Sequence, residues 1–365
     1  MVRNVDLWLK SYLIRLGQLR KYRQAGKRPL QILFTLCDHY EPYWNRVNDS
    51  EALKRVTLWL DQYPEIASNY VDCRGANPQH CFFYPEEEYK PELMEMVADI
   101  CRNGFGEVEI HLHHDNDTAG NLRATLLDFK KRLAEQHGLL SVDKKTSEVK
   151  FGFIHGNWAL DNSRPDGRWC GVNNEIDVLL ETGCYADFTM PSAPDITQTS
   201  MINSIYYAVD DPELPKSHDT GVSACCGKSQ TQGLLCVQGP LTFNCRSRKF
   251  GIIPRIENSC LAFDAPTSLY RTRLWIDQRI HVMGRADVVF VKLHTHGTQE
   301  NNMDYFFRKG GLDDLYRNLV EYSRRIGGNL YYVSTRQMYN VIKGLEKHPN
   351  VQVPGLIDRG LCLVS

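Results

Sequence analysis

The sequence lacks long apolar runs, an imbalance of charge and paired cysteine motifs. Among its 365 residues, no run approaches the ~18 apolar residues that a membrane span requires. Lys and Arg total 43 and Asp and Glu total 44, so the net charge of -1 provides no global attraction for nucleic acid. The cysteines include no Cys-x-x-Cys pair, and the sequence has no internal repeat or low-complexity tract. The remaining composition, 42% hydrophobic and 24% charged, is ordinary for a soluble globular enzyme.

The cysteines and the first residues together predict a location. The N-terminal segment does not resemble a secretory signal. Cys37, Cys81, Cys101 and Cys184 lie in apolar stretches, where a free thiol behaves as a small hydrophobe. We therefore expect reduced cysteines and a cytoplasmic protein, with disulfides as the alternative in an oxidising compartment.

Residues 1–29 predict a basic amphipathic helix. Apolar side chains recur at helical spacing, and Asp6 is the only acidic residue among residues 1–28. We expect the helix to pack its apolar stripe on the body of the protein. The alternative is a peripheral contact with an anionic membrane, at the inner face for a cytoplasmic protein. The apolar residues are Leu9, Tyr12, Leu13, Leu16 and Leu19, and the basic residues are Arg3, Lys10, Arg15, Arg20, Lys21, Arg23, Lys27 and Arg28.

Strand and helix patterns alternate along residues 30–345. This alternation predicts an α/β protein with a parallel sheet, either open or closed as a barrel. Residues 190–285 break the rhythm, and we interpret them as an elaborated insertion that could shape a substrate cleft or lid. Residues 346–365 form a C-terminal tail. The predicted strands cover residues 30–37, 81–84, 107–113, 149–154, 184–188, 287–293 and 329–333, and the predicted helices cover 50–62, 91–103, 121–137, 174–181, 311–326 and 334–345.

The most informative stretch is the polar end of the strand predicted over residues 107–113. Alternate side chains of a strand share a face, so His111 and His113 point the same way. Together with Asp117, four residues after His113, they form a candidate ligand set for zinc or a similar divalent ion. A polar strand end with solvated histidines is the alternative.

Polar residues also follow other predicted strands, at the ends where α/β folds place their sites. Asp38 and His39 could serve a metal ion or a proton transfer, or cap a loop. His294 and His296 alternate at the end of a later strand. An aromatic and polar segment suits sugar recognition, although it also suits a well-bonded polar loop. Its candidate residues are His155, Asn157, Trp158, Asp161 and Arg164, and Asp187 adds a carboxylate at another strand end.

The order of these clusters resembles the polysaccharide deacetylase superfamily, the NodB-like group that includes carbohydrate esterase family 4. In that family the first strand ends Thr-Phe-Asp-Asp-Gly, and Thr35-Leu36-Cys37-Asp38-His39 occupies the same frame. The family's Gly-x-Glu-Ile-x-x-His-x-x-x-His motif is similar to the segment from Glu109-Ile110 to Asp117. The resemblance implies a distorted (β/α) barrel over residues 30–345, with a large insertion at about 190–285.

The resemblance also implies a ligand set and catalytic roles. Asp38, His113 and Asp117 would hold the ion, with His111 as a substitute ligand. His294, in a loosely matched final motif, would be the general acid. Cys37 stands where the family has its catalytic base, so His39 or Glu41 would take that role. The motif at His155-Gly156-Asn157-Trp158 lacks the family's Arg, and Asp187 represents the fourth motif.

We therefore expect a hydrolase that depends on a divalent metal ion, with zinc as the expected ion. It would remove an acyl group, N-acetyl by expectation, from a sugar or glycan precursor, such as a nucleotide-linked or lipid-linked sugar. One alternative is a glycoside hydrolase, for which Asp38, Asp117 and Asp187 are available. Another is a carbohydrate-binding protein with a degraded site. The expected substrate contacts are His155, Asn157, Trp158, Asp161, Arg164, Asp187 and His296.

Overall fold

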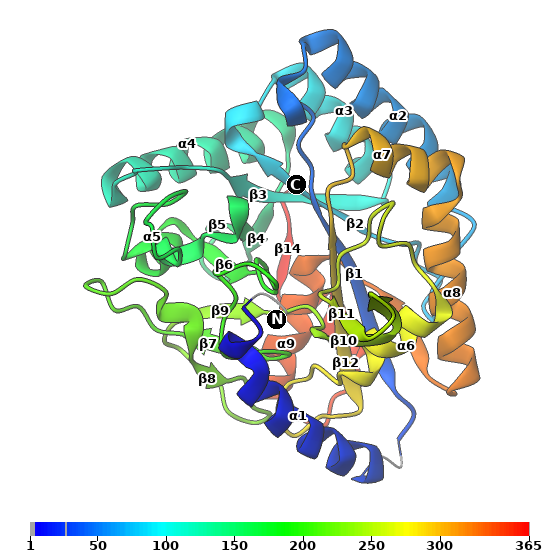
Figure 1. The fold of residues 1–365 in the computed structure, drawn as a ribbon. Coiled ribbons are helices and arrows are strands. Elements are labelled where there is room, and N and C mark those ends of the chain that lie inside the picture. The colour runs from blue at the N-terminus through cyan, green and yellow to red at the C-terminus, as the bar shows by residue number, and fades with distance from the viewer. Residues whose placement is uncertain (1–3, 26–27, 365) are drawn as a thin grey trace.

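A largely parallel sheet of 12 strands forms the centre of the protein, and helices surround it (Figure 1). The computed structural model describes residues 4–25 and 28–364. The strands follow the order β12-β1-β2-β3-β5-β6-β9-β7-β8, and β13 pairs with the first half of β1. The parallel strands are β1 (Gln31–His39), β2 (His80–Pro85), β3 (Gly106–Leu112), β5 (Val149–His155), β6 (Cys184–Asp187), β9 (Leu234–Val237), β12 (Val288–Thr295) and β13 (Asn329–Tyr332).

Shorter antiparallel pairs extend this sheet or lie beside it. Strands β7 (Ile205–Ala208) and β8 (Val222–Ser223) continue one edge. Strands β4 (Ser141–Asp143) and β14 (Leu361–Leu363) pair with each other next to β5. A separate hairpin consists of β10 (Thr242–Lys249) and β11 (Ile253–Glu257).

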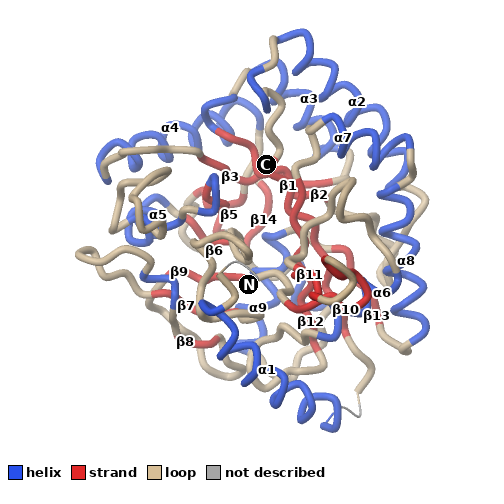
Figure 2. The backbone as a smooth tube through the Cα atoms, in the orientation of Figure 1, coloured by secondary structure: helices blue, strands red, loops and turns tan. Residues whose placement is uncertain are grey.

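Helices follow most of the parallel strands, so the predicted α/β class with a parallel sheet is confirmed (Figure 2). Local signals set several helix ends. Gly138 adopts φ 64° and ends α4, a left-handed conformation that glycine adopts without strain. Ser334 caps α9 and forms a capping box with Gln337. The helices are α1 (Asp6–Ala25), α2 (Asp49–Ala67), α3 (Pro91–Arg102), α4 (Ala119–His137), α5 (Glu175–Thr182), α6 (Leu269–Asp277), α7 (Glu300–Met303), α8 (Gly311–Arg325), α9 (Thr335–Lys347) and α10 (Pro354–Ile357).

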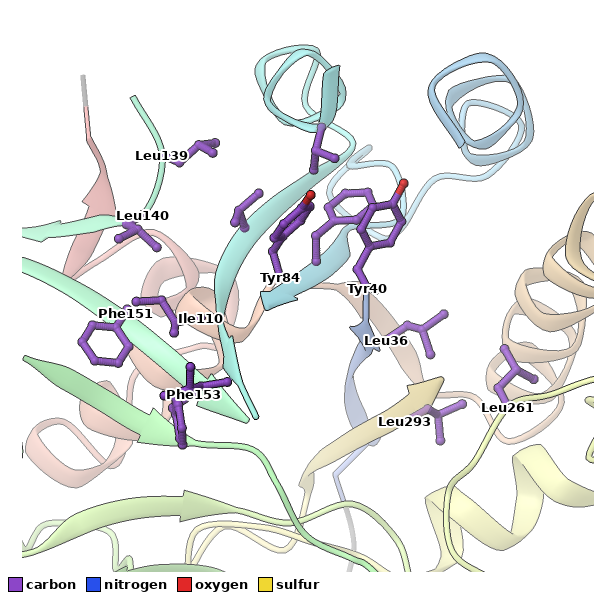
Figure 3. Packing of buried hydrophobic residues seen from close by; sticks show 14 of the residues in the cluster. Leu36, Tyr40, Tyr84, Ile110, Leu139, Leu140, Phe151, Phe153, Leu261 and Leu293 are labelled. Atoms are coloured by element: carbon purple, nitrogen blue, oxygen red, sulfur yellow. The ribbon is translucent and has the colours of Figure 1, made fainter. Parts of the chain in front are cut away.

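The two faces of the sheet carry two separate hydrophobic cores. Leu36, Ile110 and Leu293 belong to a core shared with α2, α3, α4, α5 and α8, and we call this side the outer face (Figure 3). Leu33 and Cys37 belong to a second core shared with α9 and α10, and we call this side the inner face. Because side chains alternate along a strand, neighbouring residues of β1, such as Ile32 and Leu33, contribute to different cores.

Residues 190–285 join the sheet rather than forming an addition separate from it. Strand β9 pairs with β6, and β7 pairs with β9, so part of this segment continues the main ladder. Strands β7, β8 and β9 have only two to four residues and follow one another without the long helices seen elsewhere, which explains why the β/α rhythm breaks here. The C-terminal tail is also packed, because Leu356 and Ile357 are buried and β14 pairs with β4.

Helix α1 packs on residues 190–285, which confirms the expected helix but changes its packed face. Trp8 is fully buried and forms a small core with Ala193, Ile202 and Leu241. Arg15 is buried as well and donates hydrogen bonds to the carbonyl oxygens of Gln278 and Arg279. Of the predicted stripe, Leu19 is buried and Tyr12 is half-buried, whereas Leu9, Leu13 and Leu16 are exposed.

The structure also bears on the predicted basic segment and on membrane crossing. Arg3 and Lys27 lie outside the described residues. Within the described part of the chain, no helix combines the length and the apolar character that crossing a bilayer requires.

Candidate metal centre

Four histidines and one glutamate converge on the inner face, at the carboxyl ends of β1, β3 and β12. We call these residues the inner cluster: His39, Glu41, His111, His113 and His296. Glu41 is at its centre, with its Oε1 3.4 Å from His111 Nε2 and 3.6 Å from His113 Nε2. The ring of His39 lies 4.8 Å from that of His111 and 4.6 Å from that of His296, measured between ring centres. The carboxyl ends of parallel strands meet at one edge of a sheet, which is why residues so far apart in sequence come together.

Neighbouring groups hold two of these imidazoles with Nε2 directed at Glu41. His111 Nδ1 lies 2.8 Å from the carbonyl oxygen of Ile154, so Nδ1 carries the hydrogen and Nε2 presents a lone pair. His113 Nδ1 is paired in the same way with the carboxylate of Glu87, in the 3-10 turn Glu86–Glu88 that follows β2. Hydrogen bonds of this kind orient metal-ligating histidines in known metal sites.

Two buried nitrogen atoms of the inner cluster are left without a hydrogen-bond partner among the described residues. Among the described residues, the Nε2 atoms of His39 and His111 are buried and have none. A lone pair on His111 Nε2 that faces a carboxylate oxygen is unfavourable unless a proton or a cation lies between them. The donor set therefore fits a metal ion.

Burial and neighbouring charges set the protonation of these groups. Burial lowers the pKa of His39 well below 6.5, and the nearby His296 and His111 lower it further. Burial also lowers the pKa of His296. Burial acts to raise the pKa of Glu41, but the close His111 and His296 outweigh it and lower that pKa. An ionised carboxylate beside neutral imidazoles is the combination that binds a metal ion.

His113 differs because it is partly exposed and paired with a carboxylate. Burial acts to lower the pKa of its imidazole, but the hydrogen bond with Glu87 and the charges of Glu87 and Glu41 raise it. Its side chain is 31% exposed, whereas that of His111 is fully buried. His113 therefore lies where the inner cluster meets solvent.

The inner cluster offers two overlapping ligand groups. His39, Glu41 and His296 form one, Glu41, His111 and His113 form the other, and the ligand atoms of each lie within 4.8 Å of one another. Two imidazoles and one carboxylate are the protein ligands of many catalytic zinc sites, which leave a position open for water or substrate. Each group could therefore hold a metal ion, and Glu41 is common to both groups.

His294 and Trp158 border the inner cluster. The ring of His294 lies 6.2 Å from that of His39, and its Nδ1 lies 3.4 Å from Ser259 Oγ. Burial lowers the pKa of His294 well below 6.5, and Lys292 lowers it further. Trp158 lies 6.2 Å from His296 and 6.3 Å from His39, ring centre to ring centre.

A cavity lies beyond Ser259, between the β10–β11 hairpin and α6. Its volume is about 1030 Å³, and Asn258 and Cys260, which flank Ser259 in sequence, contribute to its lining. The carbonyl oxygen of Ser259 also accepts the backbone hydrogen bond of His294. The cavity thus adjoins the strand that carries His294.

Asp38 and Asp117, two of the expected metal ligands, lie outside the inner cluster. Asp38 lies on the outer face, as Leu36 does two residues earlier in β1. There it accepts hydrogen bonds from Gly297 N at 2.6 Å and His80 Nε2 at 2.9 Å. The cause is strand alternation, because His39 and Asp38 necessarily point to opposite sides of β1. Asp117 binds the start of α4, where it accepts from Thr118 N and Asn121 Nδ2. Asp38 does tie the end of β1 to the loop after β12, and so holds the segments that carry His39 and His296.

The expected substrate residues divide into several surroundings. Trp158 and His296 are at the inner cluster, and Asn157, which adopts φ 53°, precedes Trp158. His155 instead lies 3.5 Å from Glu175 on the outer face. The other three bind local partners: Asp161 accepts from Ser217 N, Arg164 pairs with Asp166 and stacks on Trp169, and Asp187 accepts from Thr189.

The structure identifies further residues that sequence reasoning missed. Glu87 orients His113, and its signal was the Glu86-Glu87-Glu88 run directly after a strand. Cys170 and Glu175 form a group with His114 and His155, and no local spacing marked that group. Cys37 is fully buried, which raises the pKa of its thiol, so it has no features of a nucleophile.

No protein-family model and no curated protein matches this chain. The assignment of a function therefore depends on the geometry of the site.

Proposed function

We propose that this protein is a metal-dependent hydrolase whose ion binds at the inner cluster. The convergence of Glu41, His111 and His113, with His39 and His296 beside them, supports the proposal most directly. Each ligand group has two imidazoles and one carboxylate, and His113 is partly open to solvent. A purely structural ion is more often enclosed by four protein ligands.

We further propose that the fold is a distorted barrel of the NodB type. The parallel strands β1, β2, β3, β5, β6 and β12 support this, as does the position of the inner cluster at their carboxyl ends. The segment 280–283 also bridges the two edges of the sheet through single backbone hydrogen bonds. At one edge, Met283 N donates to Ala224 O beside β8, and at the other, Phe290 N in β12 donates to Ile280 O. The placement of Asp38 away from the inner cluster departs from the family's ligand set.

The proposed reaction removes an acyl group, N-acetyl by expectation, from a sugar or glycan precursor. The ion, with zinc as the expected one, would lower the pKa of a bound water and polarise the acyl carbonyl. Because Glu41 would be a ligand in either group, His39 is left as the proton acceptor for a nucleophilic water when the ion binds at Glu41, His111 and His113. His294 has a low pKa, so as general acid it must first take up a proton that it then delivers to the leaving nitrogen.

Substrate would reach the inner cluster past the partly exposed His113 or from the cavity beside Ser259. Trp158 offers an aromatic ring on which the apolar face of a sugar can stack. A cavity of about 1030 Å³ is in the range that accommodates a sugar-sized ligand. The Trp158 ring and a cavity of this size are the features that support a carbohydrate substrate.

The two alternatives gain less support. A glycoside hydrolase needs two facing carboxylates, but Asp38, Asp117 and Asp187 each bind different local partners. A carbohydrate-binding protein with a degraded site has no need for four convergent imidazoles around a buried carboxylate.

The test combines metal analysis with acyl release. The full chain is loaded with zinc or cobalt, and acetate release is measured from N-acetylated sugars, nucleotide-linked sugars and short glycans. We expect Glu41→Gln and His111→Ala to bind about one ion per chain fewer than wild type. We also expect their rate of acetate release to fall at least ~100-fold. His137→Ala is the matched control, because His137 lies on α4 and pairs with Tyr89 and Glu95.

Three other results would contradict the proposal. Wild-type protein that binds no ion after reconstitution removes its basis. An unchanged ion content in both variants moves the ion elsewhere. Cleavage of glycosidic bonds without acetate release favours the glycoside hydrolase.

A further inference from the structure

A second group of metal-type ligands lies on the outer face of the sheet and shares no residue with the inner cluster. It consists of His114, His155, Cys170 and Glu175, and their ligand atoms all lie within 4.8 Å of one another. We call it the outer cluster. His155 ends β5, Glu175 begins α5, and Leu112 at the end of β3 pairs with His155 in register. Four points of the chain therefore meet in one place between the sheet and α5.

Contacts within the outer cluster leave the lone pair of His155 Nε2 without a hydrogen-bond donor. Glu175 Oε1 lies 3.2 Å from His114 Nε2 and 3.5 Å from His155 Nε2. His155 Nδ1 lies 2.6 Å from the carbonyl oxygen of Gly156, so Nδ1 carries the hydrogen and Nε2 presents its lone pair to the carboxylate. Among the described residues, this Nε2 is buried and has no hydrogen-bond partner.

The surroundings of the other ligands are also those of a metal site. Cys170 Sγ accepts backbone hydrogen bonds from Asn162 N at 3.3 Å and Val172 N at 3.5 Å, and it donates to Glu175 Oε2 at 3.4 Å, where an ion would replace the thiol proton. His114 Nδ1 lies 3.1 Å from Asp117, and its Nε2 lies 3.2 Å from Glu175 Oε1, so an ion bound at Nε2 would take the place of that hydrogen bond. This contact gives Asp117 an orienting role in place of the ligand role expected from the sequence.

The outer cluster is closed to solvent. Cys170, His155 and Glu175 are fully buried, and the side chain of His114 is 8% exposed. Four protein ligands that include a thiol and two imidazoles, with no open position, describe a structural zinc site rather than a catalytic one. Tetrahedral ligands at ~2.0–2.3 Å from zinc lie ~3.3–3.8 Å apart, so the ligand atoms need to close by less than ~1.5 Å.

We propose that the outer cluster binds a structural divalent ion of the zinc class. The ion would hold the loop between β5 and α5, because His155 precedes that loop, Cys170 lies within it and Glu175 follows it. The loop contains several non-glycine residues with positive φ, a conformation that persists only where surrounding contacts enforce it. They are Asn157, Trp158, Asp161, Asn162 and Trp169.

The two clusters share a stretch of backbone. His113 belongs to the inner cluster and His114 to the outer cluster, and they are adjacent residues with rings on opposite faces. Trp158, which borders the inner cluster, is in the loop that the structural ion would hold. The ion would therefore position parts of the inner cluster without contacting substrate.

Cobalt spectroscopy tests the proposal, because Cys170 is the only sulfur ligand in either cluster. The full chain is loaded with Co²⁺, and the near-ultraviolet charge-transfer band of a thiolate–cobalt bond is recorded. We expect the band in wild type and in His111→Ala. We expect Cys170→Ala to lose the band, and to bind about one ion per chain fewer than wild type. Cys184→Ala is the matched control, because Cys184 is a buried thiol outside both clusters.

The outcomes separate this proposal from the proposed function. Loss of the inner ion in His111→Ala with the band intact supports two distinct sites. A wild-type chain that binds cobalt without a thiolate band overturns the outer site, whatever its hydrolase activity. If Cys170→Ala fails to fold, Glu175→Gln serves instead, and we expect a weakened or shifted band. An unchanged band in folded Glu175→Gln contradicts the proposed ligand set.

Discussion

At the scale of single residues, alternation along a strand decides what each side chain can do. His39 reaches the inner cluster, whereas Asp38 is bonded to His80 and Gly297 on the outer face. Close packing is the other residue-level constraint. Gly156 follows His155, and a Cβ at this position would lie 2.2 Å from Cδ2 of His113 and 2.8 Å from the carbonyl oxygen of Leu112. A side chain there must displace the His113 ring.

Gly156→Ala is therefore expected to weaken metal binding at the inner cluster. The added methyl group moves the His113 imidazole away from Glu41, and we expect an affinity loss of about 10-fold to 100-fold. The measurement is a competition titration of the ion with a chelator. Gly120→Ala in α4 is the control, because a Cβ there meets nothing within 4 Å. Equal affinities in the two variants would show that the His113 position is not constrained by Gly156.

The raised pKa of the buried Asp187 carboxyl predicts that the free energy of unfolding depends on pH. Burial raises the pKa of this carboxyl from 3.8 to about 7, although its bonds from Thr189 oppose the effect. Between about pH 4 and pH 7 the folded state keeps a proton that the unfolded chain releases, so the free energy of unfolding falls as pH rises through that window. The full effect, above pH 7, is roughly 4 kcal/mol.

Asp187→Asn removes this titration, so its stability should depend less on pH than that of wild type. Urea unfolding of both proteins at several pH values between 4 and 8 provides the comparison. Parallel pH profiles for the two proteins would mean that Asp187 titrates near its ordinary pKa.

At the scale of elements, strand ends and helix starts supply most of the functional positions. The inner cluster takes its residues from the ends of β1, β3 and β12, and Glu175 of the outer cluster opens α5. Helix α9 packs on the inner face, where Met338 and Val341 join the core that lies beside the inner cluster. Its start is set by Ser334, whose side chain accepts from Gln337 N.

Ser334→Ala is expected to lower the free energy of unfolding by about 1 kcal/mol, because it removes the cap of α9. Chemical denaturation measures the change. Ser323→Ala in α8 is a matched control, since Ser323 is buried and its Oγ has no hydrogen-bond partner among the described residues. A similar loss in both variants would assign the effect to the serine volume rather than to the cap.

At the scale of the whole molecule, the N-terminal helix α1 packs against residues 190–285. Its buried side holds it through Trp8 and Arg15, while Leu9, Leu13 and Leu16 form an exposed apolar stripe. Lys10, Arg20 and Lys21 are exposed on the same helix. Exposed leucines flanked by lysine and arginine are the composition of helices that lie on anionic membranes.

We expect the full chain to bind vesicles that contain anionic lipid, and to release them as salt is raised, because salt screens the attraction. Leu13→Glu should reduce binding in a co-sedimentation assay, since it removes apolar area and adds a negative charge. Leu214→Glu is the matched control, because Leu214 is 58% exposed and Leu13 is 59% exposed. Equal binding to neutral vesicles, or no effect of Leu13→Glu, would contradict the membrane contact.

The sequence by itself determined the α/β class, the approximate bounds of most parallel strands and of the longer helices, and the pairing of His111 with His113. Each of these depends on short-range periodicity, on caps such as Ser334, or on alternation within one strand. Even the opposite directions of Asp38 and His39 follow from alternation.

Only the tertiary structure decided which face carries the inner cluster. Both faces of β1 are buried, so hydrophobic pattern cannot distinguish them, and the packing of α2 on one side and α9 on the other makes the choice. The partners Glu87 of His113 and Glu175 of His155 are likewise set by how distant elements meet. Such contacts depend on the arrangement of the whole sheet, which no local spacing records.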